Sequence, residues 1–86
     1  MKFILKQTCY ACPEQYDVYL DDKKVGYMRL RHGVFSCNYP NVSGETIYIA
    51  EPKGDGVFDD DERDYYIEQA LINIMKRLDK FDYEII

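Results

Sequence analysis

The sequence predicts a single α+β domain over residues 1–86, in which one long helix packs on one face of a mainly antiparallel sheet of four to six strands. Two observations carry this prediction. A chain reversal at His32-Gly33 separates two runs in which apolar and polar residues alternate, the pattern of a half-buried hairpin. After residue 60, apolar residues recur at helical spacing, and these are Ile67, Ala70, Leu71, Ile74, Leu78 and Phe81.

The central element is the hairpin from Val25 to Tyr39. Because glycine readily adopts the positive φ of a two-residue turn, His32 and Gly33 are predicted to form that turn. The resulting register gives the hairpin two faces, since side chains alternate along each strand. The apolar face is predicted to consist of Met28, Leu30, Phe35, Cys37 and Tyr39, and the basic and aromatic face of Tyr27, Arg29, Arg31, Ser36 and Asn38.

Two further strands are predicted before the hairpin, over residues 3–8 and 16–20, with the polar residues 21–24 as the turn into the hairpin. A proline separates the first two strands, because proline cannot donate to a sheet ladder. If the second strand pairs with the first strand of the hairpin across this polar turn, Val25 falls on the face of the hairpin that is predicted to be exposed. We therefore expect either a β-bulge near Gly26, which we favour, or a sheet that is partly covered on both faces.

The second half of the chain is predicted to add a strand, a helix and a closing strand. Residues 45–50 form the fourth strand, and a glycine-rich connector follows. Asp59 and Glu62 have the spacing of a capping box, which predicts a helix from about Asp60 to Lys80. Residues 83–86 are β-prone, so we expect them to return as a strand parallel to the fourth.

Charge and hydropathy narrow the classes of function. The net charge of the acidic chain is −5, and it is divided into +2 over residues 1–43 and −7 over residues 44–86. A general nucleic-acid binder needs a surplus of cations to displace counterions, so we expect no extended nucleic acid as a partner. No stretch has the length and apolar character of a membrane span or a signal peptide, so we expect no membrane association and a cytoplasmic location.

Cys9 and Cys12 form a Cys-x-x-Cys pair. A structural zinc ion needs four ligands, and the remaining candidates are Cys37 and the single histidine, His32. A redox-active pair places its first cysteine at a helix N-terminus, whereas Pro13 leads here towards a strand. We expect two reduced thiols in a turn and keep, as an alternative, a zinc site that uses Cys9, Cys12 and Cys37.

Other catalytic and metal chemistry has little support in the sequence. No serine stands in a recognisable nucleophile motif, and His32 is the only side chain available for imidazole acid–base chemistry. The acidic residues between 55 and 62 have the composition of a calcium or magnesium site but lack the EF-hand spacing. Carboxylates at a helix N-terminus are explained equally well by the helix dipole.

The order of elements resembles the central core of the GNAT-type N-acetyltransferases over residues 16–86. Two motifs carry the resemblance: Val25-Gly26-Tyr27 at a strand-to-strand step, and residues 51–56, Glu-Pro-Lys-Gly-Asp-Gly, where that family has Gln/Arg-x-x-Gly-x-Gly/Ala before a helix. The resemblance implies that the backbone at Lys53, Gly54 and Gly56 holds the pyrophosphate of acyl-CoA. At the first position of this loop the family has Gln or Arg, whereas this chain has Glu51. We therefore expect a truncated GNAT-like shape without acetyltransferase activity.

These observations favour a non-enzymatic interaction module that binds a protein partner or associates with itself and needs no cofactor. The predicted binding residues are Tyr27, Arg29 and Arg31, because arginine suits carboxylates or a phosphate on a partner and tyrosine adds an aromatic surface. An open sheet edge is the other candidate surface. The alternatives are an acyl-CoA-binding remnant and a zinc-stapled domain, and an ordinary exposed sheet face is the simplest explanation of the arginines.

Overall fold

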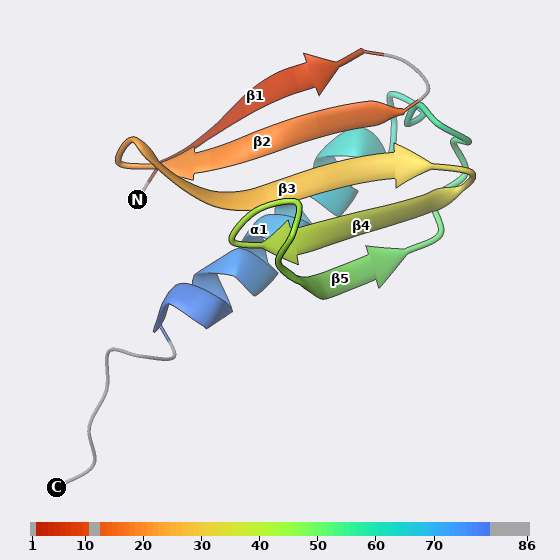
Figure 1. The fold of residues 1–86 in the computed structure, drawn as a ribbon. Helices are drawn as coiled ribbons and strands as arrows, with labels where there is room; N and C mark the ends of the chain where they lie inside the picture. The colour runs from red at the N-terminus through yellow and green to blue at the C-terminus, as the bar shows by residue number, and fades with distance from the viewer. Residues whose placement is uncertain (1, 11–12, 80–86) are drawn as a thin grey trace, which may run out of the picture.

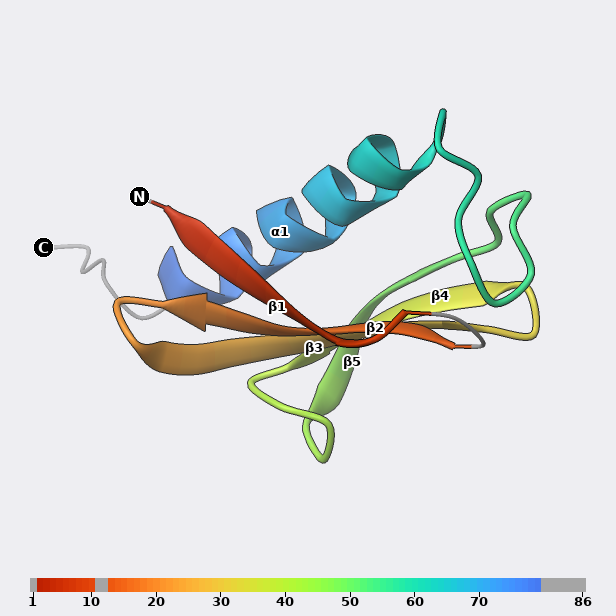
Figure 2. The ribbon, with the colours of Figure 1, turned by 90° about the horizontal axis from the view of Figure 1, so that it is seen from above.

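The computed structural model describes residues 2–10 and 13–79, and within these ranges the chain forms five strands and one helix. The strands lie side by side in chain order in one antiparallel sheet, and the helix crosses one face of it (Figure 1, Figure 2). This confirms the predicted α+β class. The elements are β1 (Phe3–Cys9), β2 (Glu14–Leu20), β3 (Lys23–Arg31), β4 (Val34–Tyr39), β5 (Glu45–Ala50) and α1 (Arg63–Asp79).

The central hairpin, β3 and β4, has the predicted turn and register. His32 and Gly33 both have positive φ, 53° and 75°, as the two central residues of a type I′ hairpin turn must have. Arg31 pairs with Val34 and Arg29 with Ser36, as the sequence predicts. The apolar side chains of the hairpin point towards α1, and the four that are fully buried are Met28, Leu30, Phe35 and Cys37.

The predicted β-bulge lies beside Gly26. Val18 pairs with Gly26 and Tyr19 pairs with Lys24, so Val25 is the extra residue of β3. The bulge lets Val25 lie in the core although it is three positions from Met28, which is an odd spacing that a regular strand places on opposite faces. The sheet therefore keeps one apolar face along its whole length.

Several boundaries differ from the prediction. β1 ends at Cys9 instead of residue 8, and β2 begins at Glu14 instead of residue 16. The turn between β2 and β3 consists of Asp21 and Asp22 alone, at φ values of 52° and 65°, rather than of the four polar residues 21–24. Aspartate tolerates this left-handed conformation because its short polar side chain bonds locally. The helix begins at Arg63 instead of about Asp60, since residues 60–62 form a turn. The predicted helix end, Phe81 and the closing strand lie outside the described residues.

The core lies between the sheet and α1. Helix residues Ala70 and Ile74 are fully buried against it, and α1 contacts β3, β4 and β5. The ring of Phe35 on β4 packs edge-on against that of Phe58 from the connector, with ring centroids 4.9 Å apart. The buried hydrophobic residues are Tyr16, Val18, Val25, Met28, Leu30, Phe35, Cys37, Phe58, Ala70 and Ile74.

The side chain of Ile74 on α1 packs directly over Gly26 of β3. A Cβ atom at this position would lie 2.6 Å from Cδ1 of Ile74, which is too close for a real contact. Gly26→Ala is therefore expected to lower the free energy of unfolding by about 1–2 kcal/mol, after a small gain from reduced backbone freedom. Ile74→Val removes the opposing Cδ1 methyl, so the alanine should cost less in that background.

This double-mutant cycle is measured by urea unfolding followed by far-UV circular dichroism. Strictly additive effects, within about 0.3 kcal/mol, would contradict the close packing of α1 on Gly26.

Candidate functional site

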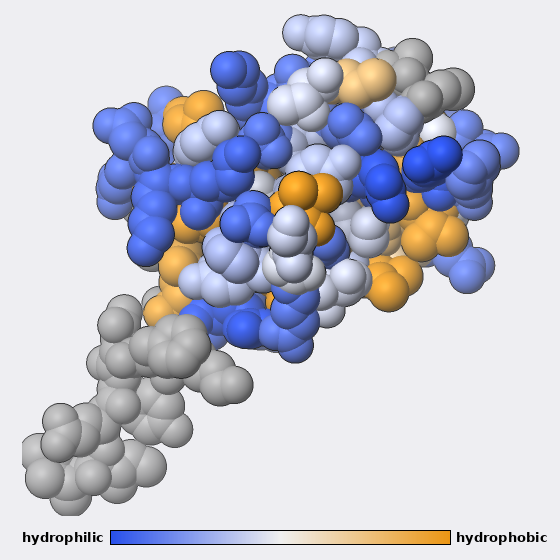
Figure 3. Space-filling view, in the orientation of Figure 1, coloured by the Kyte–Doolittle hydropathy of each residue, from blue (hydrophilic) through white to orange (hydrophobic). Residues whose placement is uncertain are grey.

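The face of the sheet that α1 leaves uncovered is called the outer face here. Among the described residues no helix lies on it, and in Figure 1 it is turned towards the viewer. Figure 3 shows this side of the molecule, where hydrophilic residues prevail and hydrophobic ones form separate patches. The outer-face residues of the three strands β2, β3 and β4 are Gln15, Asp17, Tyr19, Lys24, Tyr27, Arg29, Arg31, Val34, Ser36 and Asn38.

Tyr27, Arg29 and Arg31 lie on this outer face, as predicted. The hydroxyl of Tyr27 donates to Oε1 of Gln15 at 3.0 Å, which fixes its ring across β2. Nε of Arg31 donates to Nε2 of His32 at 3.3 Å. A shallow depression of about 440 Å³ lies at this end of the hairpin, lined by Arg29, Arg31, His32, Val34 and Ser36.

The two arginines of the outer face lack ion-pair partners within the described part of the chain. By contrast, Arg63 pairs with Glu14 and Arg77 pairs with Glu45. The outer-face carboxylate on the neighbouring strand β2 is Asp17, and its Oδ2 lies 3.4 Å from Nζ of Lys24. A chain with a net charge of −5 therefore carries a local cationic patch with no carboxylate assigned to it.

A second depression, of about 280 Å³, adjoins the same hairpin turn. Its lining residues come from the start of β2, from the turn and from the connector, and they are Pro13, Arg31, His32, Asp55 and Gly56. Arg31 and His32 thus line both depressions. Asp55 is exposed and forms no ion pair with Arg31 among the described contacts.

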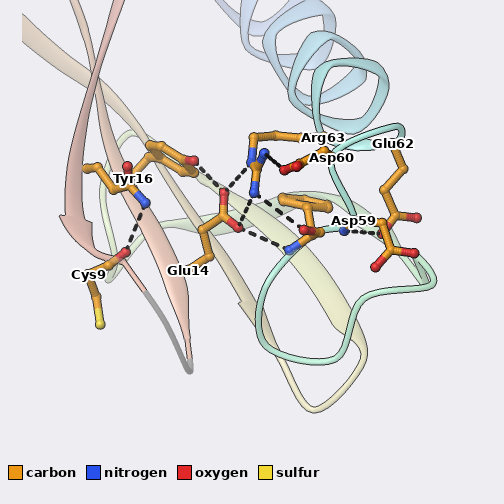
Figure 4. Close-up of polar contacts among 9 residues, drawn as sticks. Cys9, Glu14, Tyr16, Asp59, Asp60, Glu62 and Arg63 are labelled. Carbon is orange, nitrogen blue, oxygen red and sulfur yellow. Dashed lines mark hydrogen bonds and ion pairs between the residues drawn. The ribbon is translucent and has the colours of Figure 1, made fainter.

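The connector between β5 and α1 is organised by the carboxylate of Glu62. It accepts hydrogen bonds from the backbone N–H groups of Lys53, Gly54 and Asp59 at 2.8, 2.9 and 3.0 Å. Burial alone would raise the pKa of Glu62, but these three bonds outweigh it and lower the pKa. The bond from Asp59 is one half of the predicted capping box, whose glutamate reaches back to the preceding turn (Figure 4).

This connector is the loop that the GNAT resemblance assigns to acyl-CoA. The N–H groups of Lys53 and Gly54, which the resemblance aims at a pyrophosphate, point instead to Glu62. The ammonium group of Lys53 lies 3.1 Å from a carboxylate oxygen of Asp61, and Gly56 accepts a backbone hydrogen bond from Glu14 at 2.7 Å. The three predicted cofactor-binding residues therefore already serve the fold.

Glu14 is the structurally central residue that the sequence analysis missed. Its side chain is 1% exposed, and its carboxylate accepts from Nε of Arg63 at 2.9 Å and from the N–H of Phe58 at 3.0 Å. The hydroxyl of Tyr16 also donates to it (Figure 4). Burial favours a raised pKa for Glu14, but the bonds from Arg63, Tyr16 and Phe58 outweigh it, so the pKa lies below its usual value.

Glu14 was missed because nothing local marks it. It follows a proline in a stretch that reads as a loop, and its partner Arg63 is 49 residues away. The only sequence signal is a lone charged residue at the start of an alternating strand, where its side chain falls on the apolar face. That position demands a partner, because a buried carboxylate without one is costly.

The predicted zinc ligands are not brought together by the described residues. Cys9 ends β1 and Cys37 lies in the middle of β4, three strand spacings away, or roughly 14 Å. Cys37 is fully buried, and burial raises the pKa of its thiol to about 12. Cys12 lies outside the described residues. Within residues 2–10 and 13–79, no three His, Cys, Asp or Glu side chains are grouped to hold a metal ion.

Comparisons with protein-family models, with curated proteins and with solved structures found no significant match. No helix in the described ranges has the length and apolar character needed to cross a bilayer.

Removing the carboxylate of Glu14 should destabilise the fold. Glu14→Gln is expected to lower the free energy of unfolding by about 3 kcal/mol. This value is near the lower end of the range for a broken buried ion pair, because Arg63 keeps its hydrogen bond to Asp60. Urea unfolding gives the value. The matched control is Asp60→Asn, which removes an exposed partner of the same arginine and should cost about 1 kcal/mol or less. Equal losses in the two variants would contradict the central role of Glu14.

Acid should weaken the fold through both buried carboxylates. Their pKa values in the native state lie below the unfolded value of 4.5, so the native state binds fewer protons than the unfolded state does. Their contribution to stability is complete above that value and is lost as the pH falls through the native pKa values. We expect the free energy of unfolding, measured in urea, to drop between about pH 5 and about pH 3.

The double variant Glu14→Gln with Glu62→Gln should have a lower free energy of unfolding at neutral pH than the wild type. Its free energy of unfolding should fall less between about pH 5 and about pH 3. Glu68→Gln, at an exposed position of α1, should keep the wild-type decline. A double variant that declines as steeply as the wild type would place the acid sensitivity elsewhere.

Proposed function

We propose that this protein is a non-enzymatic interaction module that binds an acidic partner protein through the outer face of its sheet, centred on Tyr27, Arg29 and Arg31. The observation that carries the proposal is the pair of arginines without an ion-pair partner among the described residues, on the face that α1 leaves uncovered. The other two arginines of the described chain are both paired with carboxylates. Guanidinium groups that have no carboxylate partner within the described chain suit carboxylates supplied from outside.

The surroundings of the arginines support a protein surface as the partner. Ile49 on β5 is 64% exposed and pairs with Ser36, so an apolar side chain lies in the same cross-strand row as Arg29. Val34, opposite Arg31, is 40% exposed. Protein interfaces are enriched in arginine and aromatic residues beside apolar groups, and this face combines them.

A second copy of the chain is the other partner that the fold admits. β1 and β5 are the two edges of the described sheet, and an edge strand can pair with another strand. Acyl-CoA binding gains no support from the connector, because Glu62 already uses the N–H groups of Lys53 and Gly54. Zinc gains none from the separation of Cys9 and Cys37.

Charge reversal on the outer face should abolish partner binding. The variant Arg29→Glu with Arg31→Glu is expected to lose the proteins that the wild-type chain captures by chemical cross-linking in an extract of its own cells. The matched control is Lys2→Glu with Lys23→Glu, which changes the net charge equally at exposed positions away from the hairpin turn and should keep them. Both variants are checked for folding by circular dichroism.

Capture of the same proteins by the folded arginine variant would contradict the proposal. Sedimentation equilibrium of the purified chain identifies self-association, since a dimer that persists in the arginine variant points to a sheet edge instead of the outer face.

A further inference from the structure

We propose that the depression between Arg29, Arg31, His32 and Ser36 is a binding site for a phosphate monoester dianion. This inference rests on the proposed function and specifies the chemistry that the outer face recognises. The two sources of such a group are a phosphorylated side chain on a partner protein and a free small phosphate monoester.

The spacing of the two arginines suits one phosphate group. They stand two residues apart on β3, which separates their Cα atoms by about 6.8 Å and points both side chains to the same face. At that separation two guanidinium groups reach one phosphate from opposite sides, each through hydrogen bonds of about 2.8 Å. A lysine pair would offer point charges, whereas arginine offers several N–H groups in a fixed plane.

Further donors surround the arginines. Ser36 lies directly opposite Arg29 and lines the depression, so it adds a hydroxyl group. His32 accepts at Nε2 from Arg31, so a neutral ring carries its proton on Nδ1 as another donor. Gln15, on the other side of Arg29, uses its carbonyl oxygen for Tyr27 and keeps its NH₂ group for a ligand. These groups outnumber the two oxygens of a carboxylate and match the three of a phosphate monoester.

No carboxylate of the described residues forms an ion pair with the two arginines of the site. Across the strands, Arg29 faces Gln15 and Ser36, and Arg31 faces Val34, all of which are uncharged. Asp17 is occupied by Lys24, and Glu14 points into the core towards Arg63. Asp55 lines the neighbouring depression, which shares Arg31 and His32 with this one, but it forms no ion pair with Arg31. An incoming dianion therefore meets two positive charges that no described carboxylate pairs with.

A single phosphate fits the charge of the protein better than nucleic acid does. An oligonucleotide gains affinity by releasing counterions along a row of phosphates, which requires many cations. The depression has two arginines, on a chain whose net charge is −5. Repulsion from the rest of the chain grows with every phosphate added, whereas one phosphate contacts only the local patch.

The test is a titration of the isotope-labelled full chain at constant ionic strength, followed by amide NMR. The probes are inorganic phosphate, a short peptide with one phosphoserine, the same peptide with glutamate in its place, and an oligothymidylate of eight nucleotides. We expect saturating shifts confined to the neighbourhood of Arg29, Arg31, His32 and Ser36, and affinity for the phosphopeptide about tenfold or more above that for the glutamate peptide. A phosphopeptide that binds more tightly than inorganic phosphate identifies a phosphorylated side chain as the source, and equal affinities identify a small phosphate monoester.

Two variants test the residues. Arg29→Gln with Arg31→Gln should weaken phosphopeptide binding about tenfold or more, because it removes charge-assisted hydrogen bonds. Lys2→Gln with Lys23→Gln changes the net charge equally and should leave binding unchanged. If the arginine pair variant does not fold, Arg31→Gln alone at its exposed position gives the same comparison.

Three results would overturn the proposal. One is equal affinity for the glutamate and phosphoserine peptides, which would leave the acidic-partner function standing while removing the phosphate. Another is tighter binding of the oligothymidylate at the same residues, which would assign the site to nucleic acid. The third is the absence of saturation by any probe, in which case the charge-reversal experiment decides the proposed function separately.

Discussion

The ion pair between Glu14 and Arg63 determines how the helix is joined to the sheet. Glu14 begins β2 and Arg63 begins α1, so one buried carboxylate connects the first residues of both elements. The same carboxylate accepts the N–H of Phe58, whose ring then packs on Phe35 in the core. With three segments held at one point, α1 has one end fixed on the sheet, and its apolar stripe covers the face on which Met28 and Leu30 lie.

A second buried carboxylate, Glu62, performs the same task for the connector. Three backbone N–H groups that would otherwise be unsatisfied in a tight loop converge on it. The close approach of the chain to itself at Gly54, where an added Cβ would lie 2.0 Å from the carbonyl oxygen of Val57, leaves no room for a side chain. A glycine-rich loop before a helix is thus explained here by internal hydrogen bonding.

The distribution of charge follows from these contacts. Two carboxylates of the second half of the chain, Asp60 and Asp61, pair with Arg63 and Lys53 at the start of α1 and in the connector, and Arg63 also pairs with Glu14 of β2. None of them forms an ion pair with Arg29 or Arg31 on the outer face of β3, although Asp55 of the connector shares a depression with Arg31. An acidic protein therefore presents a small cationic surface, and this separation of charge underlies both proposals made for the outer face.

Local chemistry in the sequence determined the hairpin, the alternation of its faces, the bulge beside Gly26 and the existence of the helix. Each depends on neighbours in the chain: a glycine that permits positive φ, a period of two, or a period of 3.6. The tertiary structure alone decided that Glu14 is buried against Arg63, that Glu62 occupies the N–H groups of Lys53 and Gly54, and that Cys37 lies far from Cys9. Those outcomes depend on which distant segments meet, and no local period or turn preference encodes the distance between residues 49 positions apart.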